Sequence, residues 1–224
     1  MMVEIFEIDD DLSICRQSGG FQYEVRGCVR REVLIDQGRF CFGIVVSGSL
    51  TINGSVCGAN EFVAGAGTYF SLVGGSLSPQ QDCSALVVLG GGNSPLAMIG
   101  GPVERVGRLR YVDGCSDTLL IPPSRLGEPC LNLLHMPVGT NQRMHFHPSD
   151  RVGVILRGQG ECITDQWMKP LRAGQGWLIP EMTNHCFRTD TSPMDVIAWH
   201  PDSDYGPTDE NHPMINRTWI RAKS

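Results

Sequence analysis

The chain has 224 residues, long enough for one or two domains that each bury a core, and its composition is that of an ordinary soluble globular protein. Its net charge of -6 and its lack of a Lys/Arg cluster argue against nucleic acid as a partner. No apolar run approaches the roughly 18 residues that span a bilayer, and the acidic start is unlike a signal peptide, so we expect no membrane association and a cytoplasmic location.

The first half of the chain is predicted to consist of short strands separated by turn residues. Two strands are expected near residues 3–8 and 21–29. From Glu32 the strand-like runs are EVLIDQ, GRFCFGIVVSGSLTING, EFVAGAGTYFSL and SALVVLGG, each bounded by Gly, Asn or Ser. With 27 Gly, 14 Pro and few uninterrupted helical patterns, the whole chain is predicted to be all-β.

The second half holds the clearest chemical signal. His145 and His147 lie one residue apart in GTNQRMHFHPSDRVGVILRGQG. On an extended strand alternate side chains share a face, so the two imidazoles point to one side and Phe146 to the other. One strand can thereby offer two ligands to one metal ion. A third histidine, His185, lies in GQGWLIPEMTNHCF, a run that opens with a Gly-rich turn.

Together these stretches resemble the two metal-binding motifs of the cupin superfamily over about residues 128–200. The first motif is matched at Gly139, His145, His147 and Gly158, and the second at Gly174, Pro180 and His185. Arg151 stands where cupins carry a glutamate ligand, and Met182 and Thr189 replace a glycine and an asparagine. The resemblance implies one divalent metal per chain, held by His145, His147 and His185, with Fe(II) favoured and Zn, Ni or Mn as alternatives.

The order of the runs also repeats along the chain. GIVVSGSLTI precedes VAGAGTYFSL, as GVILRGQGECI precedes LRAGQGWLIP. With the resemblance, the repeat predicts a bicupin: two tandem jelly-roll barrels, an N-terminal unit at 1–110 and a metal-binding unit at 111–224 with a tail that wraps along a barrel. The first unit is similar to the sugar-binding barrel of AraC-type regulators too, but no helix-turn-helix pattern accompanies it.

The N-terminal unit has no histidine, since His135 is the earliest in the chain, so a structural or dimer-forming role is expected for it. A homodimer is predicted because the exposed edge strands of such barrels are commonly covered by a partner.

Further residues can be placed around the metal by strand alternation. If a strand starts at Arg151, this residue and Gly153 share one face, which the resemblance turns toward the barrel interior. Gly153 is then expected to leave empty volume beside the metal. Arg151 either anchors a carboxylate or enolate or forms a salt bridge with Asp150 or Glu181. Asp150 is an alternative fourth ligand, and His200 could orient a ligand or the substrate.

Three function classes remain open. Three neutral imidazoles leave the full charge of a dication to attract a small anionic substrate. Three-histidine cupins suggest an Fe(II)-dependent dioxygenase, a mononuclear non-haem oxygenase in which Arg151 is catalytic. The alternatives are a non-redox isomerase or lyase with the metal as Lewis acid, and a non-catalytic cupin that senses or stores a ligand.

Overall fold

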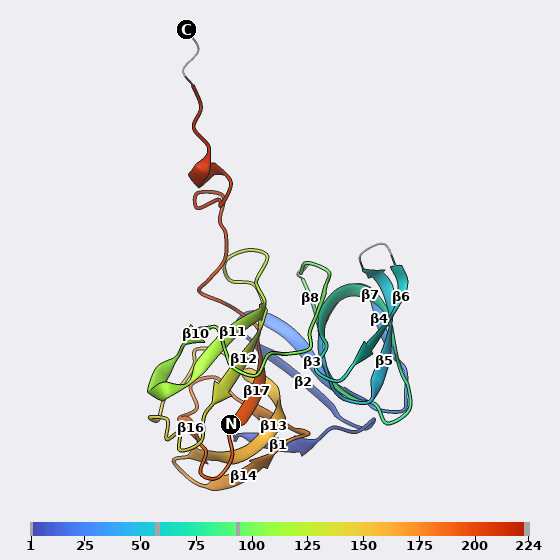
Figure 1. Cartoon of the computed structure of the whole chain (residues 1–224). Coiled ribbons are helices and arrows are strands. Elements are labelled where there is room, and N and C mark those ends of the chain that lie inside the picture. The colour runs from blue at the N-terminus through green and yellow to red at the C-terminus, as the bar shows by residue number, and fades with distance from the viewer. Residues whose placement is uncertain (1, 57–58, 93–94, 222–224) are drawn as a thin grey trace.

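The computed structural model describes residues 2–56, 59–92 and 95–221 (Figure 1). Within these ranges the regular structure is β-strand, apart from two 3-10 turns at Val112–Gly114 and Ile215–Arg217, and α-helix is absent. The all-β prediction is confirmed. Neither of these short turns has the length or the apolarity that crossing a membrane requires.

The first sheet is built from strands of the N-terminal half. It has eight strands in the order β2-β3-β8-β4-β7-β5-β6, with β9 paired to β7. Its strands are β2 (Ser13–Ser18), β3 (Phe21–Cys28), β4 (Val33–Ser47), β5 (Ser49–Val56), β6 (Ala59–Gly65), β7 (Tyr69–Pro79), β8 (Ser84–Gly91) and β9 (Met98–Gly100). Figure 1 shows them curled into a barrel-like unit.

The second sheet has nine strands in the order β1-β15-β13-β17-β12-β11-β10, and β14 and β16 also pair with β13. Its strands are β1 (Glu4–Glu7), β10 (Leu109–Arg110), β11 (Ser116–Ile121), β12 (Cys130–Met136), β13 (Arg151–Thr164), β14 (Met168–Arg172), β15 (Gln175–Ile179), β16 (His185–Arg188) and β17 (Met194–His200). Strand β1 therefore pairs within the sheet of the second half, where the Phe6 ring lies over Gly176. The division into units 1–110 and 111–224 stays a prediction.

The central strands are apolar on both faces because each face meets a different core. In β4, Phe40, Phe42 and Ile44 pack into a core between the two sheets, whereas Cys41 and Val45 pack into the interior of the first sheet. Strand β17 alternates in the same way, since its Ile197 and Trp199 join the core between the sheets. The core between the sheets is closed by Trp199, whose ring lies 4.9 Å from Tyr23 and 6.4 Å from Phe42, measured between ring centroids. The two sheets thus share a buried apolar interface.

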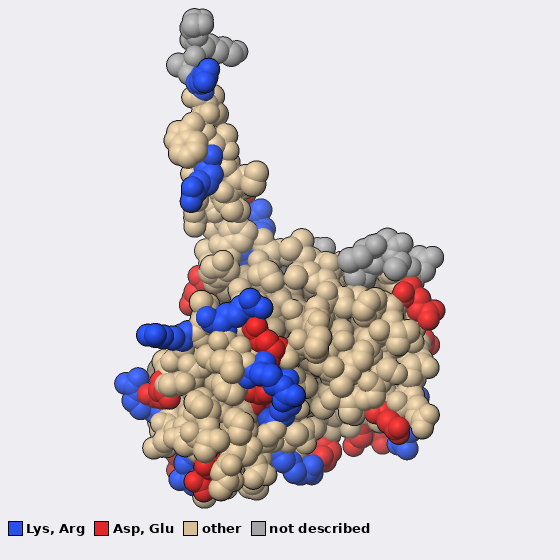
Figure 2. Space-filling view, viewed as in Figure 1, with Lys and Arg blue, Asp and Glu red and all other residues tan. Residues whose placement is uncertain are grey.

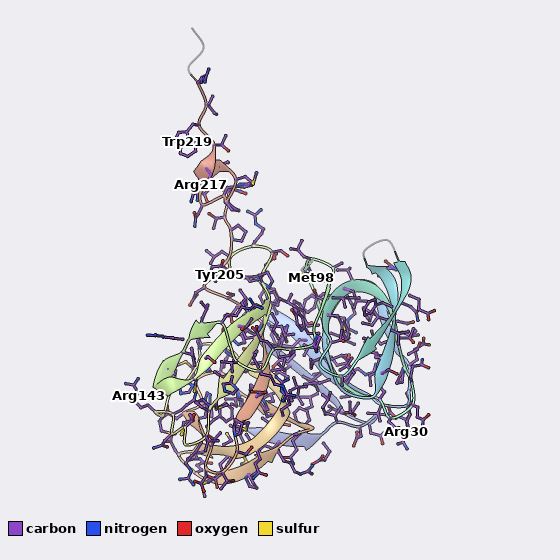
Figure 3. The ribbon with its side chains drawn as sticks, in the orientation of Figure 1. Arg30, Met98, Arg143, Tyr205, Arg217 and Trp219 are labelled. Atoms are coloured by element: carbon purple, nitrogen blue, oxygen red, sulfur yellow. The ribbon has the colours of Figure 1, made fainter. Side chains whose placement is uncertain are left out.

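The chain after β17 departs from the expected wrapping course. Up to Asp209 it contacts the 125–127 loop through backbone hydrogen bonds and the Arg125–Asp209 ion pair of 3.1 Å. Beyond that point it projects from the body, and Trp219 is 83 % exposed (Figures 1 and 3). Its hydrogen bonds there are internal, such as Asn216 N–H to His212 O at 3.0 Å, so it follows no barrel. On the face drawn in Figure 2, basic and acidic side chains are interspersed.

Candidate metal centre

Three histidines come together where two segments of the second half meet. His145 and His185 form an antiparallel bridge in which each backbone N–H donates to the other's carbonyl, at 3.0 and 2.9 Å. The His147 carbonyl accepts a bond of 2.8 Å from the Met182 N–H. His145 and His147 therefore lie in a loop outside the regular strands, while the Phe146 side chain is 54 % exposed, in keeping with its predicted opposite orientation.

The three imidazoles are close enough to share one ion. Ring centroids are separated by 5.1 Å for His145 and His147, 4.6 Å for His145 and His185, and 5.2 Å for His147 and His185. One nitrogen from each ring lies within 4.8 Å of the others. Nitrogens bound at about 2.0–2.1 Å to a common zinc ion lie at most about 4.2 Å apart, so the rings need only a small approach to share an ion.

The hydrogen bonds of two rings leave the other nitrogen free for a metal. His145 Nδ1 lies 2.9 Å from the Arg143 carbonyl, and His185 Nδ1 lies 2.9 Å from the Thr183 carbonyl. Because a carbonyl can only accept, both Nδ1 atoms must carry the proton, which leaves the Nε2 lone pairs unused. This backbone anchoring is typical of metal-ligating histidines. The donor set therefore fits a divalent metal.

Burial keeps two of the rings neutral. Desolvation, reinforced by the Arg151 charge and the neighbouring histidines, lowers the pKa of His147 to about 3. Desolvation also lowers the pKa of His185 to about 4, although the Thr183 carbonyl opposes the shift. Neutral imidazole is the form that binds metals, so these two rings need not lose a proton at neutral pH.

These pKa shifts predict that the metal-free protein loses stability as pH falls below about 6.5. His185 has a pKa of 6.5 in the unfolded chain and of about 4 in the folded protein. At a pH between these two values the unfolded chain binds more protons than the folded protein, so acid favours unfolding. For this residue, only 1 % exposed, the free energy of unfolding falls by up to about 2 kcal/mol at pH 5. Urea titrations of metal-free wild type and His185→Gln at pH 7 and 5 measure the effect. An equally large pH dependence in the variant would contradict this assignment.

A cavity of about 180 Å³ adjoins the three histidines. Its apolar wall is formed by Leu134, Trp177, Ile179, Phe187, Val196 and Ala198. Its polar wall is formed by Tyr111, Asp117, Asn132, Gln142, Arg151 and His200. Asn132 donates to both Asp117 oxygens at 3.1 and 3.2 Å, and burial raises the pKa of this carboxyl. Tyr111, Asp117, Asn132 and Gln142 were missed in the sequence because no spacing rule links them to the histidines.

Arg151 lines this cavity with one donor unused. Its Nη1 donates to the Ser149 hydroxyl at 2.5 Å and to the Ser149 and Asp150 carbonyls at 3.1 Å. The Asp202 carboxylate lies 3.8 Å away, so the ion-pair partner is neither of the acids expected from the sequence, Asp150 and Glu181. Its Nε is buried and has no hydrogen-bond partner among the described residues. The side chain is thus fixed at one end and retains a donor.

Gly153 does not leave the empty volume expected from its position. A Cβ built there would lie 1.9 Å from the Ile197 carbonyl oxygen and 2.6 Å from Trp177 Cζ2. The glycine instead lets the strand β17 backbone and the Trp177 indole approach closely. The expectation of space beside the metal was wrong, because the indole of the adjacent strand fills it.

The two further ligand candidates have different surroundings. Asp150 is fully buried, and its carboxylate is bound by Arg16 and Tyr23 from the N-terminal sheet, outside the histidine cluster. His200 lines the cavity, and burial, followed by the charges of Arg151 and His147, lowers its pKa well below the usual range. The structure thus gives Asp150 other partners and places His200 beside the cavity.

A family model matches part of the chain, and several solved structures are similar to it. The cupin domain model, Cupin_2, matches residues 132–200. A cupin 2 conserved barrel domain protein from Leptotrichia buccalis is 14 % identical, with a TM-score of 0.58 and 88 % of each chain covered. The protein Ylba from E. coli is 14 % identical, with a TM-score of 0.58 and coverage of 92 % of this chain and 84 % of that one.

A third similar structure carries a ligand in its description. It is a salicylate 1,2-dioxygenase from Pseudoaminobacter salicylatoxidans described as adducts with gentisate, 10 % identical, with a TM-score of 0.59 and coverage of 82 % of this chain and 69 % of that one. At these identities the likenesses show the fold alone. No curated protein matches the sequence.

Proposed function

We propose that this chain is a metal-dependent enzyme acting on a small organic anion, and that its reaction is an Fe(II)-dependent dioxygenation. The match of residues 132–200 to the cupin domain model supports the proposal. One observation carries the proposal: three clustered imidazoles, two of them with the Nε2 lone pair unused, and a largely buried arginine adjoin the same cavity. A cation held by the imidazoles and the guanidinium would together present positive charge to one bound molecule.

The metal would be held by His145, His147 and His185. When bound, it supplies Lewis acidity and, as Fe(II), reactivity toward O₂. With only three protein ligands, the ion would keep positions open for oxygen atoms of a substrate. The role of Arg151 is to present its guanidinium charge to a substrate carboxylate or enolate oxygen, while its Nη1 bonds to Ser149 hold the guanidinium in place.

The cavity limits the size of the substrate. Its volume of about 180 Å³ is below the roughly 300–1,000 Å³ typical of sites for drug-sized ligands. Trp177 and Phe187, 3 % and 4 % exposed, form an apolar wall that excludes water from the substrate. A small aromatic or dicarbonyl acid fits these limits, and the gentisate adduct of the salicylate dioxygenase supports this class by analogy. The homodimer and the cytoplasmic location stay predictions.

The test is anaerobic reconstitution of metal-free protein with Fe(II), followed by screening of carboxylates, diketones and catechols. We expect a ligand-to-metal absorption band on addition of the substrate, and oxygen uptake once air is admitted. Arg151→Met should weaken substrate binding about 10- to 100-fold, because a charged donor is lost, and should leave iron binding intact.

The outcome also separates the alternative functions. If zinc-loaded protein converts a substrate under argon and the iron form takes up no oxygen, the chain is an isomerase or lyase. Binding without turnover by either form would instead indicate a sensing or storage protein.

A further inference from the structure

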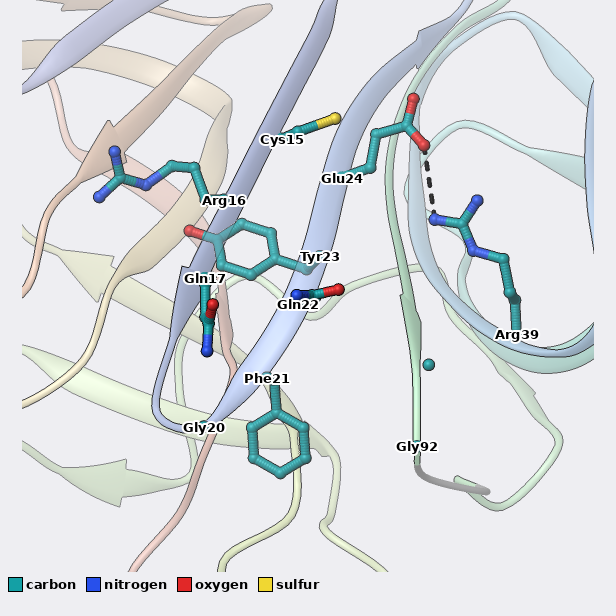
Figure 4. A pocket seen from close by; sticks show the side chains of 11 residues that line it. Cys15, Arg16, Gln17, Gly20, Phe21, Gln22, Tyr23, Glu24, Arg39 and Gly92 are labelled. Atoms are coloured by element: carbon teal, nitrogen blue, oxygen red, sulfur yellow. Dashed lines mark hydrogen bonds and ion pairs between the residues drawn. The ribbon is translucent and has the colours of Figure 1, made fainter.

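The N-terminal sheet carries no histidine, yet three of its polar side chains reach the two loops beside the clustered histidines, residues 146–150 and 180–184, which we call the histidine loops. Arg16 and Ser18 come from β2, and Tyr23 comes from β3. Figure 4 shows the Arg16 guanidinium and the Tyr23 hydroxyl on one side of this hairpin, and the Glu24–Arg39 ion pair on the other. The hairpin therefore has a side directed at the second half of the chain.

The first point of contact is the Asp150 carboxylate, which is fully buried. Its Oδ2 accepts from Arg16 Nε at 2.6 Å and from the Tyr23 hydroxyl at 2.5 Å. Its Oδ1 accepts from Arg16 Nη2 at 3.3 Å and from the Glu181 backbone N–H at 2.8 Å. One carboxylate thus joins the hairpin to both loops, because Asp150 follows His147 and Glu181 precedes His185.

The second point of contact is Ser18, which is 4 % exposed. Its hydroxyl accepts from the Asp150 N–H at 2.9 Å and donates to the Glu181 carboxylate at 2.9 Å. Ser18 therefore makes a second link from the hairpin to both loops, independent of the one made by the Asp150 carboxylate. Each of the two loops is held both by backbone and by side-chain bonds.

The loops depend on side-chain contacts because they lack regular backbone pairing. Residues 146–150 and 180–184 lie outside the strands. Between these loops the backbone makes one bond, from Met182 N–H to the His147 carbonyl, next to the His145–His185 bridge. The Arg16–Asp150 pair is 14 % and 0 % exposed, so water and salt screen it weakly. Breaking one partner of such a pair costs more than breaking a surface contact.

We propose that Arg16, Ser18 and Tyr23 are positioning residues that act through Asp150 and Glu181 to fix the spacing of the histidine loops, so that the histidine-free N-terminal sheet sets the metal affinity of the other sheet. The inference rests on the proposed function in one respect, namely that the histidines bind a metal.

The first test measures zinc affinity in the full chain by competition with a chromophoric chelator. Tyr23→Phe and Arg16→Met should weaken zinc binding about 10- to 100-fold, the range found when groups supporting metal ligands are removed. Tyr23→Phe keeps the ring that packs against Trp199, so only the hydroxyl is lost. The matched control is Arg39→Met, which removes an ion pair of 3.4 Å on the other side of the same hairpin and should change zinc affinity less than twofold.

A double-mutant cycle tests whether the effect passes through the carboxylate. In an Asp150→Asn background, Arg16→Met should weaken zinc binding far less than it does in wild type, because its partner has already been altered. Fully additive losses would show that Arg16 acts by another route and would overturn the assignment.

The second readout requires no metal. Hydrogen exchange at the Glu181 amide of metal-free protein should be at least 10-fold faster in Tyr23→Phe and Arg16→Met than in wild type, and unchanged in Arg39→Met. Unchanged exchange and zinc affinity with a lowered melting temperature would indicate a purely structural contact and overturn the inference. Failure of the wild-type protein to bind zinc would instead overturn the proposed function. It would also overturn the inference that the N-terminal sheet sets the metal affinity.

Discussion

Replacing His185 by alanine is expected to abolish tight binding of a divalent metal, with affinity reduced at least 1,000-fold. The residue supplies one of three imidazoles, and its backbone pairs with His145, so both the ligand and the local geometry depend on this position. Loss of one charged or metal-bound contact in a buried site commonly costs several kcal/mol, and each 1.4 kcal/mol is a factor of ten. Elemental analysis of purified protein should give one metal per chain for wild type and none for the variant.

The control for this experiment is His212→Ala. His212 is not one of the three clustered histidines, and its Nδ1 accepts a local hydrogen bond of 3.1 Å from the Met214 N–H, so metal content should stay at the wild-type level. Full occupancy in His185→Ala, or two tightly bound metals per chain in wild type, would refute the three-histidine centre.

Gly153→Ala is expected to destabilise the protein by about 3 kcal/mol or more. Strand β13 lies between β15 and β17, so Gly153 has Trp177 and Ala198 as its paired neighbours and neither strand can retreat. The added methyl group would meet a backbone oxygen at 1.9 Å. Alanine gains only about 0.5–1 kcal/mol over glycine from backbone entropy, so the steric term decides the sign.

Urea denaturation with a two-state fit measures this loss as a lower midpoint at unchanged slope. Gly65→Ala is the matched control, because Gly65 is also in a strand and a Cβ there would have no atom within 4 Å. Its stability should stay within about 0.5 kcal/mol of wild type. Equal stability of both variants would show that the contacts at Gly153 relax without cost.

The strands and the histidine cluster could be predicted from the sequence because both follow short-range rules. Alternating apolar residues and Gly-rich turns indicate strands directly, and the spacing of His145, His147 and His185 matches a motif. The surroundings of Gly153 could not be predicted by such rules. The absence of a side chain is compatible with empty space or with a close neighbour, and only the position of Trp177 decides between them.

Asp150 shows a second limit. Its place beside the motif suggested a ligand, but its partners Arg16 and Tyr23 are 134 and 127 residues away along the chain. Local alternation carries no information about which sheet packs against a loop. The place of Asp117 and Asn132 in the cavity could not be predicted for the same reason, since they come from β11 and β12, which precede the first histidine motif.

The pairing of β1 with β15 has a consequence for synthesis of the chain. Glu4 pairs with Leu178, so the strand is translated long before its partner. At about 5–20 residues per second the ribosome needs on the order of 10–35 s to make the intervening segment. During that time the nascent chain can complete its eight-stranded sheet, while Ile5 and Phe6 remain without their partners on β15. Strand β1 is therefore made long before it can reach its place in a sheet.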